Sequence, residues 1–420
     1  MMRSPQPQPL PPTILLIILL HKCIALQHGN WSRRDLIQSG LLLPLTTTLP
    51  MNAATAEGSP PRLAEEFYHP NLATNPEAGR FYFPALTPPF RNRATCRYDL
   101  GRQQWAFEQL LTFANVKATI QTTVVELKTG GLWVHSPQYP TDEFLALLQD
   151  LKKPVEHIVL PCNALEHKAP MKDFCNKFPH AQVWISLGQY GPFGSCGKSL
   201  ADCKMGYRVN GVLGACHPPW EDELEMATLY VDLPENAGPI SEVAFCHKKS
   251  TQTLIATDAL IFIPSQGPPS IFSTYFDQQI MDADSNFWAK SVLQAIFLPL
   301  RQDIIGNYPG FDALKDRLVR APILRAFSDA RAPQAALEWI DTITKWKFDR
   351  IVTSHFASPI IATPRNVKET FGYLEDPPPQ LEQLPPISCQ DWELLEGLNQ
   401  VIAKNKLGAI ATFDYSKGCK

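Results

Sequence analysis

Short apolar runs alternate with amphipathic segments through the middle of the chain, and this alternation predicts its elements. Runs rich in β-branched and aromatic residues predict strands over residues 119–127, 132–134, 155–160, 181–186, 243–246, 253–257 and 349–353. Apolar residues at helical spacing predict helices over residues 142–151, 171–178, 287–298 and 334–346. Gly130 and Gly131 join the first two strands as a hairpin, whereas helices follow later strands. We therefore expect an α/β domain with a mixed sheet.

Segments rich in proline flank this α/β domain on both sides. Residues 57–95 combine prolines with aromatic side chains and predict an extended arm laid over the domain. Residues 366–420 begin with two proline clusters and end in an amphipathic helix expected over residues 391–404, which predicts a linker and a docking helix. The folded domain is therefore expected over residues 96–365.

The first 56 residues have the pattern of targeting sequences. An apolar run too short to span a bilayer, residues 13–20, is typical of a signal-peptide core, so we interpret residues 1–26 as a signal peptide. Residues 27–56 combine Arg33-Arg34, an apolar stretch and Ala54-Thr55-Ala56, which resembles a twin-arginine export signal with its cleavage site. Two signals in series resemble the bipartite presequences of algae whose plastids are entered through the secretory system.

This resemblance implies a destination for the protein. The mature chain is expected to begin near Glu57 and to reach the thylakoid lumen of a plastid, with no permanent membrane span. The plastid stroma and secretion are alternative destinations. A single membrane anchor or a disordered tail is the alternative interpretation of the same residues.

The composition narrows the class of protein. The 420 residues are 45% hydrophobic and 19% charged, with a formal net charge of −3, which is typical of a globular protein. The near-neutral charge argues against a nucleic-acid binder. The sequence has no glycine-rich phosphate loop, strand-turn-serine elbow or Cys-x-x-Cys pair. These absences argue against the common nucleotide-binding, serine-hydrolase and zinc-ribbon classes.

Side chains that can bind a metal follow three of the predicted strands. Glu166 and His167 follow the strand over residues 155–160, Asp258 follows the strand over residues 253–257, and His355 follows the strand over residues 349–353. Ligands gather at strand ends because a rigid sheet aims the side chains of its loops into a crevice. Two carboxylates and two imidazoles suit zinc, iron or manganese, with an open position left for water.

Several sequence segments, in this order and at these intervals, resemble the metallo-β-lactamase-like superfamily. They resemble in particular an uncharacterised branch from cyanobacteria and plastids that is known only as a domain of unknown function. The resemblance is carried by residues 131–137, 157–161, 166–168, 250–258 and 351–356. It implies a four-layer αββα sandwich with the active site at one edge of the paired sheets.

The resemblance also implies roles for individual residues. The superfamily motif His-x-His-x-Asp-His falls on Cys162, Ala164, Glu166 and His167, so two histidines are missing. Asp258 falls on the metal-bridging aspartate and His355 on the last histidine. A single metal ion held by Glu166, His167, Asp258 and His355 is therefore expected in place of a dinuclear centre. Asp258 is also the expected catalytic residue, because it can orient a water molecule.

Two further residues are candidate ligands. Cys162 could contribute a thiolate, and His217 could replace a lost histidine. The simpler interpretation is that Cys162 is a small core residue and that His217 is a loop residue beside prolines.

The site and the resemblance together predict a mononuclear metal-dependent hydrolase of an ester, thioester or phosphodiester. The alternative is a non-catalytic binding or assembly factor of the lumen that kept the fold but lost the metal. The enzyme would act on an unidentified small molecule, and the assembly factor would bind a protein partner of the lumen. The sequence does not identify the substrate.

Overall fold

The computed structural model describes most of the α/β domain. It describes residues 94–375, apart from residues 114–115, 192–193, 196–204, 232–238, 249–251, 275, 277 and 297, together with residues 66–67 and 86–87. The targeting segment and the C-terminal helix expected from the sequence lie outside the described residues, as does most of the expected arm. Among the described residues, no helix has the length and apolar character that crossing a membrane requires.

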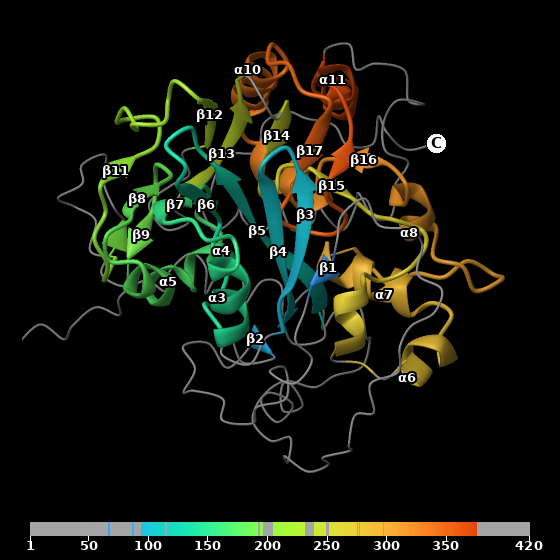
Figure 1. The fold of residues 1–420 in the computed structure, drawn as a ribbon. Helices are drawn as coiled ribbons and strands as arrows, with labels where there is room; N and C mark the ends of the chain where they lie inside the picture. Colours follow the sequence, from blue (N-terminus) through green and yellow to red (C-terminus); the bar gives the residue numbers. More distant parts are fainter. Residues whose placement is uncertain are drawn as a thin grey trace, which may run out of the picture.

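The larger of two sheets is an antiparallel meander that continues into a parallel half (Figure 1). Its nine strands are β1 (Glu66–Phe67), β2 (Leu86–Thr87), β3 (Cys96–Gly101), β4 (Gln104–Phe113), β5 (Val116–Glu126), β6 (Leu132–His135), β7 (Val155–Leu160), β8 (Gln182–Ile185) and β11 (Gly211–Val212). Strands β3 to β6 pair antiparallel, and β7, β8 and β11 follow β6 in parallel. Because parallel strands are covered on both faces, β7 and β8 are mostly apolar.

The smaller sheet is also mixed. Its five strands are β12 (Leu224–Val231), β13 (Ile240–His247), β14 (Thr253–Ile255), β17 (Arg350–Val352) and β18 (Ile360–Ile361). Only β14 and β17 pair in parallel, and this pairing joins segments that are far apart in the sequence. Two short ribbons complete the described strands: β9 (Tyr190–Gly191) with β10 (Gly194–Ser195), and β15 (Ile261–Phe262) with β16 (Leu318–Val319).

Helices cover the outer face of each sheet (Figure 1). The α-helices are α3 (Asp142–Gln149), α4 (Leu165–Lys168), α5 (Met171–Lys177), α6 (Gln278–Ala283), α7 (Phe287–Ala295), α8 (Pro309–Leu314), α9 (Pro322–Leu324), α10 (Pro333–Ile343) and α11 (Pro364–Thr370). Single turns are η4 (Ser270–Thr274), the π-helical η5 (Arg325–Asp329) and η6 (Gly372–Leu374). Phe144 of α3 and Phe174 of α5 pack on the larger sheet, whereas Trp339 of α10 and Val367 of α11 pack on the smaller one.

A separate apolar core lies between the two sheets. Trp133 of β6 meets Phe245 of β13 at a ring-centroid distance of 5.0 Å and Trp220 at 5.6 Å, both edge to face. In β5, Val124 packs with the outer helices, and its neighbour Val125 packs in this inner core. This alternation follows from the period of two in a strand. Helices, sheet, sheet and helices therefore form four layers, and the predicted αββα sandwich is confirmed.

The strands and helices that the sequence predicts for the domain are present at or near the predicted residues. The hairpin is formed by β5 and β6, and the Thr141 hydroxyl accepts the amide hydrogen of Phe144 at 3.1 Å as the N-cap of α3. Helix α10 ends at Ile343, three residues before the predicted end, because the next residues form turns; the Trp346 amide donates to the Ile343 carbonyl at 3.2 Å. Strands β3, β4 and β12 were not predicted, although the sequence of β3 alternates apolar and polar residues.

Candidate metal centre

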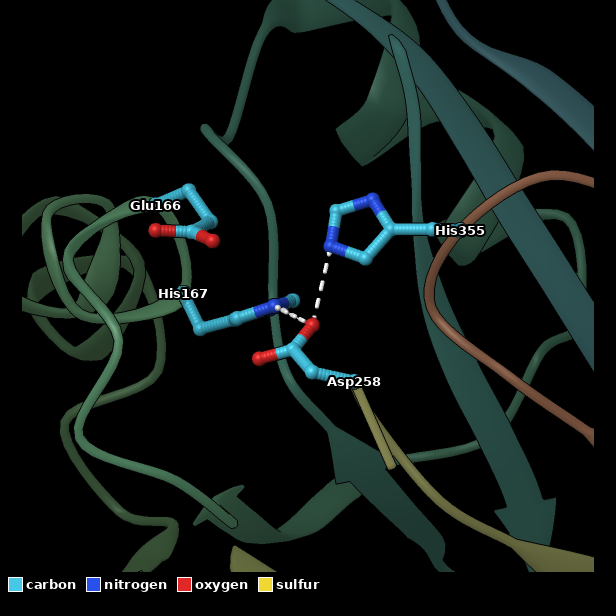
Figure 2. Close-up of side chains that lie close together, drawn as sticks. All are labelled: Glu166, His167, Asp258 and His355. Atoms are coloured by element: carbon cyan, nitrogen blue, oxygen red, sulfur yellow. Dashed lines mark hydrogen bonds and ion pairs between the residues drawn. The ribbon is translucent and has the colours of Figure 1, made fainter. Parts of the chain in front are cut away.

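Four side chains from both sheets converge at the ends of their strands. Glu166 and His167 lie in α4, directly after β7 of the larger sheet. Asp258 follows β14 and His355 follows β17, the parallel pair of the smaller sheet. One ligand atom of each residue lies within 4.8 Å of the others. Figure 2 shows His355 approaching from the side opposite Glu166 and His167.

Asp258 lies at the centre of this cluster. Its Oδ1 is 3.2 Å from His167 Nε2 and 3.0 Å from His355 Nε2 (Figure 2). The side chain of His167 is fully buried, whereas those of His355 and Asp258 are 13% and 20% exposed. Glu166 is half-buried. The cluster is therefore set into the protein but is reached by solvent on one side.

Hydrogen bonds to the outer ring nitrogens orient both imidazoles. The Nδ1 of His355 lies 2.7 Å from the Thr119 carbonyl oxygen. A carbonyl oxygen only accepts, so this Nδ1 carries a hydrogen and Nε2 faces the cluster. The Nδ1 of His167 lies 2.5 Å from the Ser136 hydroxyl. Outer partners of this kind hold the rings of metal-binding histidines in place.

The charges of the cluster shift the pKa values of its members. Burial opposes ionisation of Asp258, but the charges and hydrogen bonds of His167 and His355 outweigh it and hold the pKa of this carboxyl below its ordinary value. Burial likewise opposes the charged form of His355, but the hydrogen bond and charge of Asp258 raise its pKa to about 9. In the metal-free protein at neutral pH, His355 Nε2 therefore carries a proton where a metal ion would bind.

Cys162 and His217 do not join the cluster. Cys162 is 2% exposed, and burial, followed by the charges of Asp258 and Glu242, raises the pKa of its thiol well above the ordinary value. A buried thiol of this kind does not supply a thiolate. The imidazole of His217 is 90% exposed, and its Nδ1 lies 2.9 Å from a carboxylate oxygen of Glu221. The simpler interpretations, a core cysteine and a surface histidine, agree with these positions.

His135 is a buried residue beside the cluster to which the sequence assigned no role. Its ring stacks on Trp133 at a centroid distance of 5.4 Å and meets the edge of Phe245 at 5.6 Å. Burial, together with the charge of His167, lowers its pKa to about 3, so it is neutral at physiological pH. The sequence signal that could have identified it is its position directly after the predicted strand over residues 132–134.

The residues of the cluster fit one transition-metal ion. Two imidazole nitrogens and two carboxylates form a donor set suited to zinc, iron or manganese. Ligand atoms bound to one ion at about 2.0–2.2 Å lie at most about 4.0–4.4 Å apart. The four ligand atoms lie within 4.8 Å of one another, so small movements of the side chains would bring them all within bonding distance of one ion. Cys162 and Ala164 provide no second set of ligands.

The four layers and the cluster at the strand ends define an αββα sandwich with a candidate metal centre at one edge of its paired sheets. The chain belongs to the family described as Domain of unknown function (DUF4336), whose model matches residues 102–296 and 306–373. The prediction of a family of unknown function is thereby confirmed, whereas its plastid and cyanobacterial origin stays a prediction. No curated protein matches the sequence.

Solved structures similar to this chain include metallo-β-lactamases and a flavodiiron protein. The metallo-β-lactamase from Pontibacter korlensis is 13% identical, with 66% of this chain and 98% of that chain covered and a TM-score of 0.34. The mono-zinc form of FIM-1 from Pseudomonas aeruginosa is 11% identical, with 74% and 96% covered and a TM-score of 0.33. The Flv1 flavodiiron core from Synechocystis sp. is 11% identical, with 67% and 61% covered and a TM-score of 0.38. The chain thus spans less than two thirds of that flavodiiron core.

Proposed function

We propose that the protein is a mononuclear metal-dependent hydrolase of an ester, thioester or phosphodiester. The observation that carries this proposal is the position of Asp258 Oδ1 between two imidazole Nε2 atoms, with Glu166 beside them. Zinc, iron and manganese are the metals that this donor set suits. A bound ion of this kind would lower the pKa of a water molecule and polarise the carbonyl or phosphoryl oxygen of the substrate.

The residues of this chain would hold and orient the reactants. Thr119 and Ser136 fix the two imidazoles from behind, which keeps the cluster arranged before a substrate arrives. Asp258 Oδ1 lies between both imidazoles, and its carboxylate would accept a hydrogen from a water molecule. Asp258 thereby orients the attacking water as well as holding the metal. The partial exposure of Asp258 and His355 gives a substrate access to this position.

A calorimetric metal titration tests the proposal. We expect about one Zn²⁺ ion per chain, with release of about one proton at pH 7 because the pKa of His355 is raised to about 9. The proton competes with the metal below that pKa, so the apparent affinity should rise roughly tenfold per pH unit from pH 7 to about 9. Titrations in buffers of different ionisation enthalpy measure the released proton.

The same titration can overturn the proposal. A protein that takes up none of Zn²⁺, Fe²⁺ and Mn²⁺, and whose thermal stability no metal changes, is not a metal-dependent hydrolase. That result would favour the alternative, a non-catalytic binding or assembly factor that kept the fold.

We also propose that residues 1–56 direct the protein to the thylakoid lumen of a plastid. The support is the sequence pattern alone, an apolar signal core followed by Arg33-Arg34 and a small-residue site. We expect N-terminal sequencing of the protein from its native cells to show that the mature chain begins near Glu57. A mature start well before Arg33 would contradict processing in the lumen and would favour the stroma or secretion.

A further inference from the structure

We infer that Glu242, in β13, is a positioning residue that holds Asp258 in place between the two imidazoles. This inference rests on the proposed metal site and adds to it a residue outside the four candidate ligands. Glu242 is 5% exposed, and it is a carboxylate in a strand whose next three residues, Val243, Ala244 and Phe245, are fully buried. Burial of a carboxylate is unfavourable unless hydrogen bonds replace those it made with water, so the partners of Glu242 indicate its role.

One oxygen of Glu242 binds the whole Asp258 loop, which is defined here as residues 257–259. Its Oε1 accepts the backbone amide hydrogens of Thr257 at 2.9 Å, Asp258 at 3.1 Å and Ala259 at 3.0 Å. It also accepts the Thr257 hydroxyl hydrogen at 3.0 Å. Three consecutive amides that converge on one anion form a concave backbone turn. This turn fixes the backbone from which the Asp258 side chain projects.

A second charged side chain holds the same loop from its carbonyl side. Arg320 Nη1 donates to the Ala259 carbonyl at 3.2 Å. Asp329 holds this guanidinium in a bidentate pair, with Nε to Oδ2 at 3.0 Å and Nη2 to Oδ1 at 2.8 Å, and the Tyr373 hydroxyl donates to Asp329. Arg320, Asp329 and Tyr373 are all buried. The Asp258 loop is therefore held between the carboxyl group of Glu242 and the guanidinium group of Arg320.

The backbone around Glu242 also holds the segment that leads to Glu166 and His167. The Val243 amide donates to the Pro161 carbonyl at 2.8 Å, and Cys162 pairs with Glu242 in an isolated antiparallel bridge. Glu242 thus lies between segments from both sheets. Its side chain binds the Asp258 loop, and its neighbours Ser241 and Val243 bind the backbone of the segment after β7. A substitution at Glu242 should therefore change the geometry of the cluster more than it changes the rest of the fold.

The test compares Glu242→Gln with wild-type protein, first without metal. The amide oxygen keeps the shape and one acceptor but lacks the charge that strengthens each of the hydrogen bonds. We expect the amides of Thr257, Asp258 and Ala259 to exchange with deuterium about tenfold faster, which corresponds to a loss of about 1.4 kcal/mol. Glu143→Gln is the matched control, because buried Glu143 of α3 accepts the Thr95 amide hydrogen at 2.8 Å and should leave these three amides unchanged.

The second measurement is the binding of metal to the same variants. Zn²⁺ affinity is expected to fall about 10- to 100-fold in Glu242→Gln, as it does when the outer partners of metal ligands are lost. The absorption bands of the Co²⁺-loaded protein should shift, because they report ligand geometry. Glu143→Gln should change neither. A general loss of stability would speed exchange throughout the domain and would leave the Co²⁺ bands in place.

Each outcome distinguishes this inference from the proposed function. Unchanged exchange at the three amides, or unchanged Zn²⁺ affinity in a metal-binding protein, overturns the positioning role. A wild-type protein without metal affinity overturns the proposed function, and the exchange result in metal-free protein still decides whether Glu242 holds the Asp258 loop. Should Glu242→Gln fail to fold, Thr257→Val removes only the hydroxyl bond, and faster local exchange is expected at the same amides. Unchanged exchange in Thr257→Val would overturn the inference.

Discussion

Replacing His167 and His355 together by alanine is expected to remove the metal from the protein. These two residues supply both imidazoles of the cluster, and their Nε2 atoms lie 3.2 and 3.0 Å from the same oxygen of Asp258. Structural zinc sites in zinc-finger peptides bind with roughly 10–16 kcal/mol in total, so the loss of two of four ligands should weaken binding by about 10³-fold or more. Elemental analysis after dialysis should change from about one equivalent of metal per chain to none.

Thermal unfolding gives an independent measure of the same change. A ligand at 100 times its Kd stabilises the folded state by about 2.7 kcal/mol, and the double variant should lose this metal-dependent gain. His217→Ala is the matched control, because this exposed imidazole contacts Glu221 and lies outside the cluster. It should bind metal like the wild type. A double variant that retains a full equivalent of metal would show that the ion binds elsewhere.

Replacing Asp258 by asparagine is expected to abolish most of the hydrolysis. Asparagine keeps the shape of the side chain but removes its negative charge. It therefore weakens the bond to the metal and removes the carboxylate that accepts a hydrogen from water. Loss of a general base typically lowers the rate about 10²- to 10⁴-fold, and we expect a fall of this size in kcat for a nitrophenyl ester or a bis-nitrophenyl phosphodiester. Measurement with saturating metal separates this effect from a loss of metal affinity.

Asp222→Asn is the control for this experiment. Asp222 is a surface carboxylate that pairs with Lys128 at 3.1 Å, and its replacement should leave hydrolysis unchanged. Turnover that survives in Asp258→Asn at the wild-type rate would contradict a role for Asp258 in the reaction. Comparison of the two variants also removes the contribution of any contaminating hydrolase.

The candidate ligands could be named from the sequence because each one lies within a few residues of the end of a predicted strand. The apolar runs that became β7, β14 and β17 place the following side chains at a sheet edge. The family resemblance then aligned Glu166, His167, Asp258 and His355 with known ligand positions. The sequence favoured these residues over Cys162 and His217, and the packing of both sheets decided the burial and orientation of all six.

The supporting residues could not be named from the sequence. Thr119 is central in β5 and reaches His355 only through the packing of the larger sheet beside the segment after β17. Glu242 stands in a mostly apolar strand, and its partners at residues 257–259 become neighbours through the antiparallel pairing of β13 with β14. A charged residue within an apolar strand pattern indicates that the residue has a special partner. That partner can be identified only once the pairing of the strands is known.

The sequence by itself determined the elements and the chemistry available at their ends. Apolar periodicity, the Thr141 cap and the glycines of the hairpin act over a few residues, so they can be read locally. The tertiary structure decided which of these side chains meet. His167 and Asp258 are 91 residues apart in the chain, and their contact depends on the parallel pairing of β14 with β17 and on the core between the two sheets. Such contacts arise from the summed burial of many apolar side chains, which no local pattern encodes.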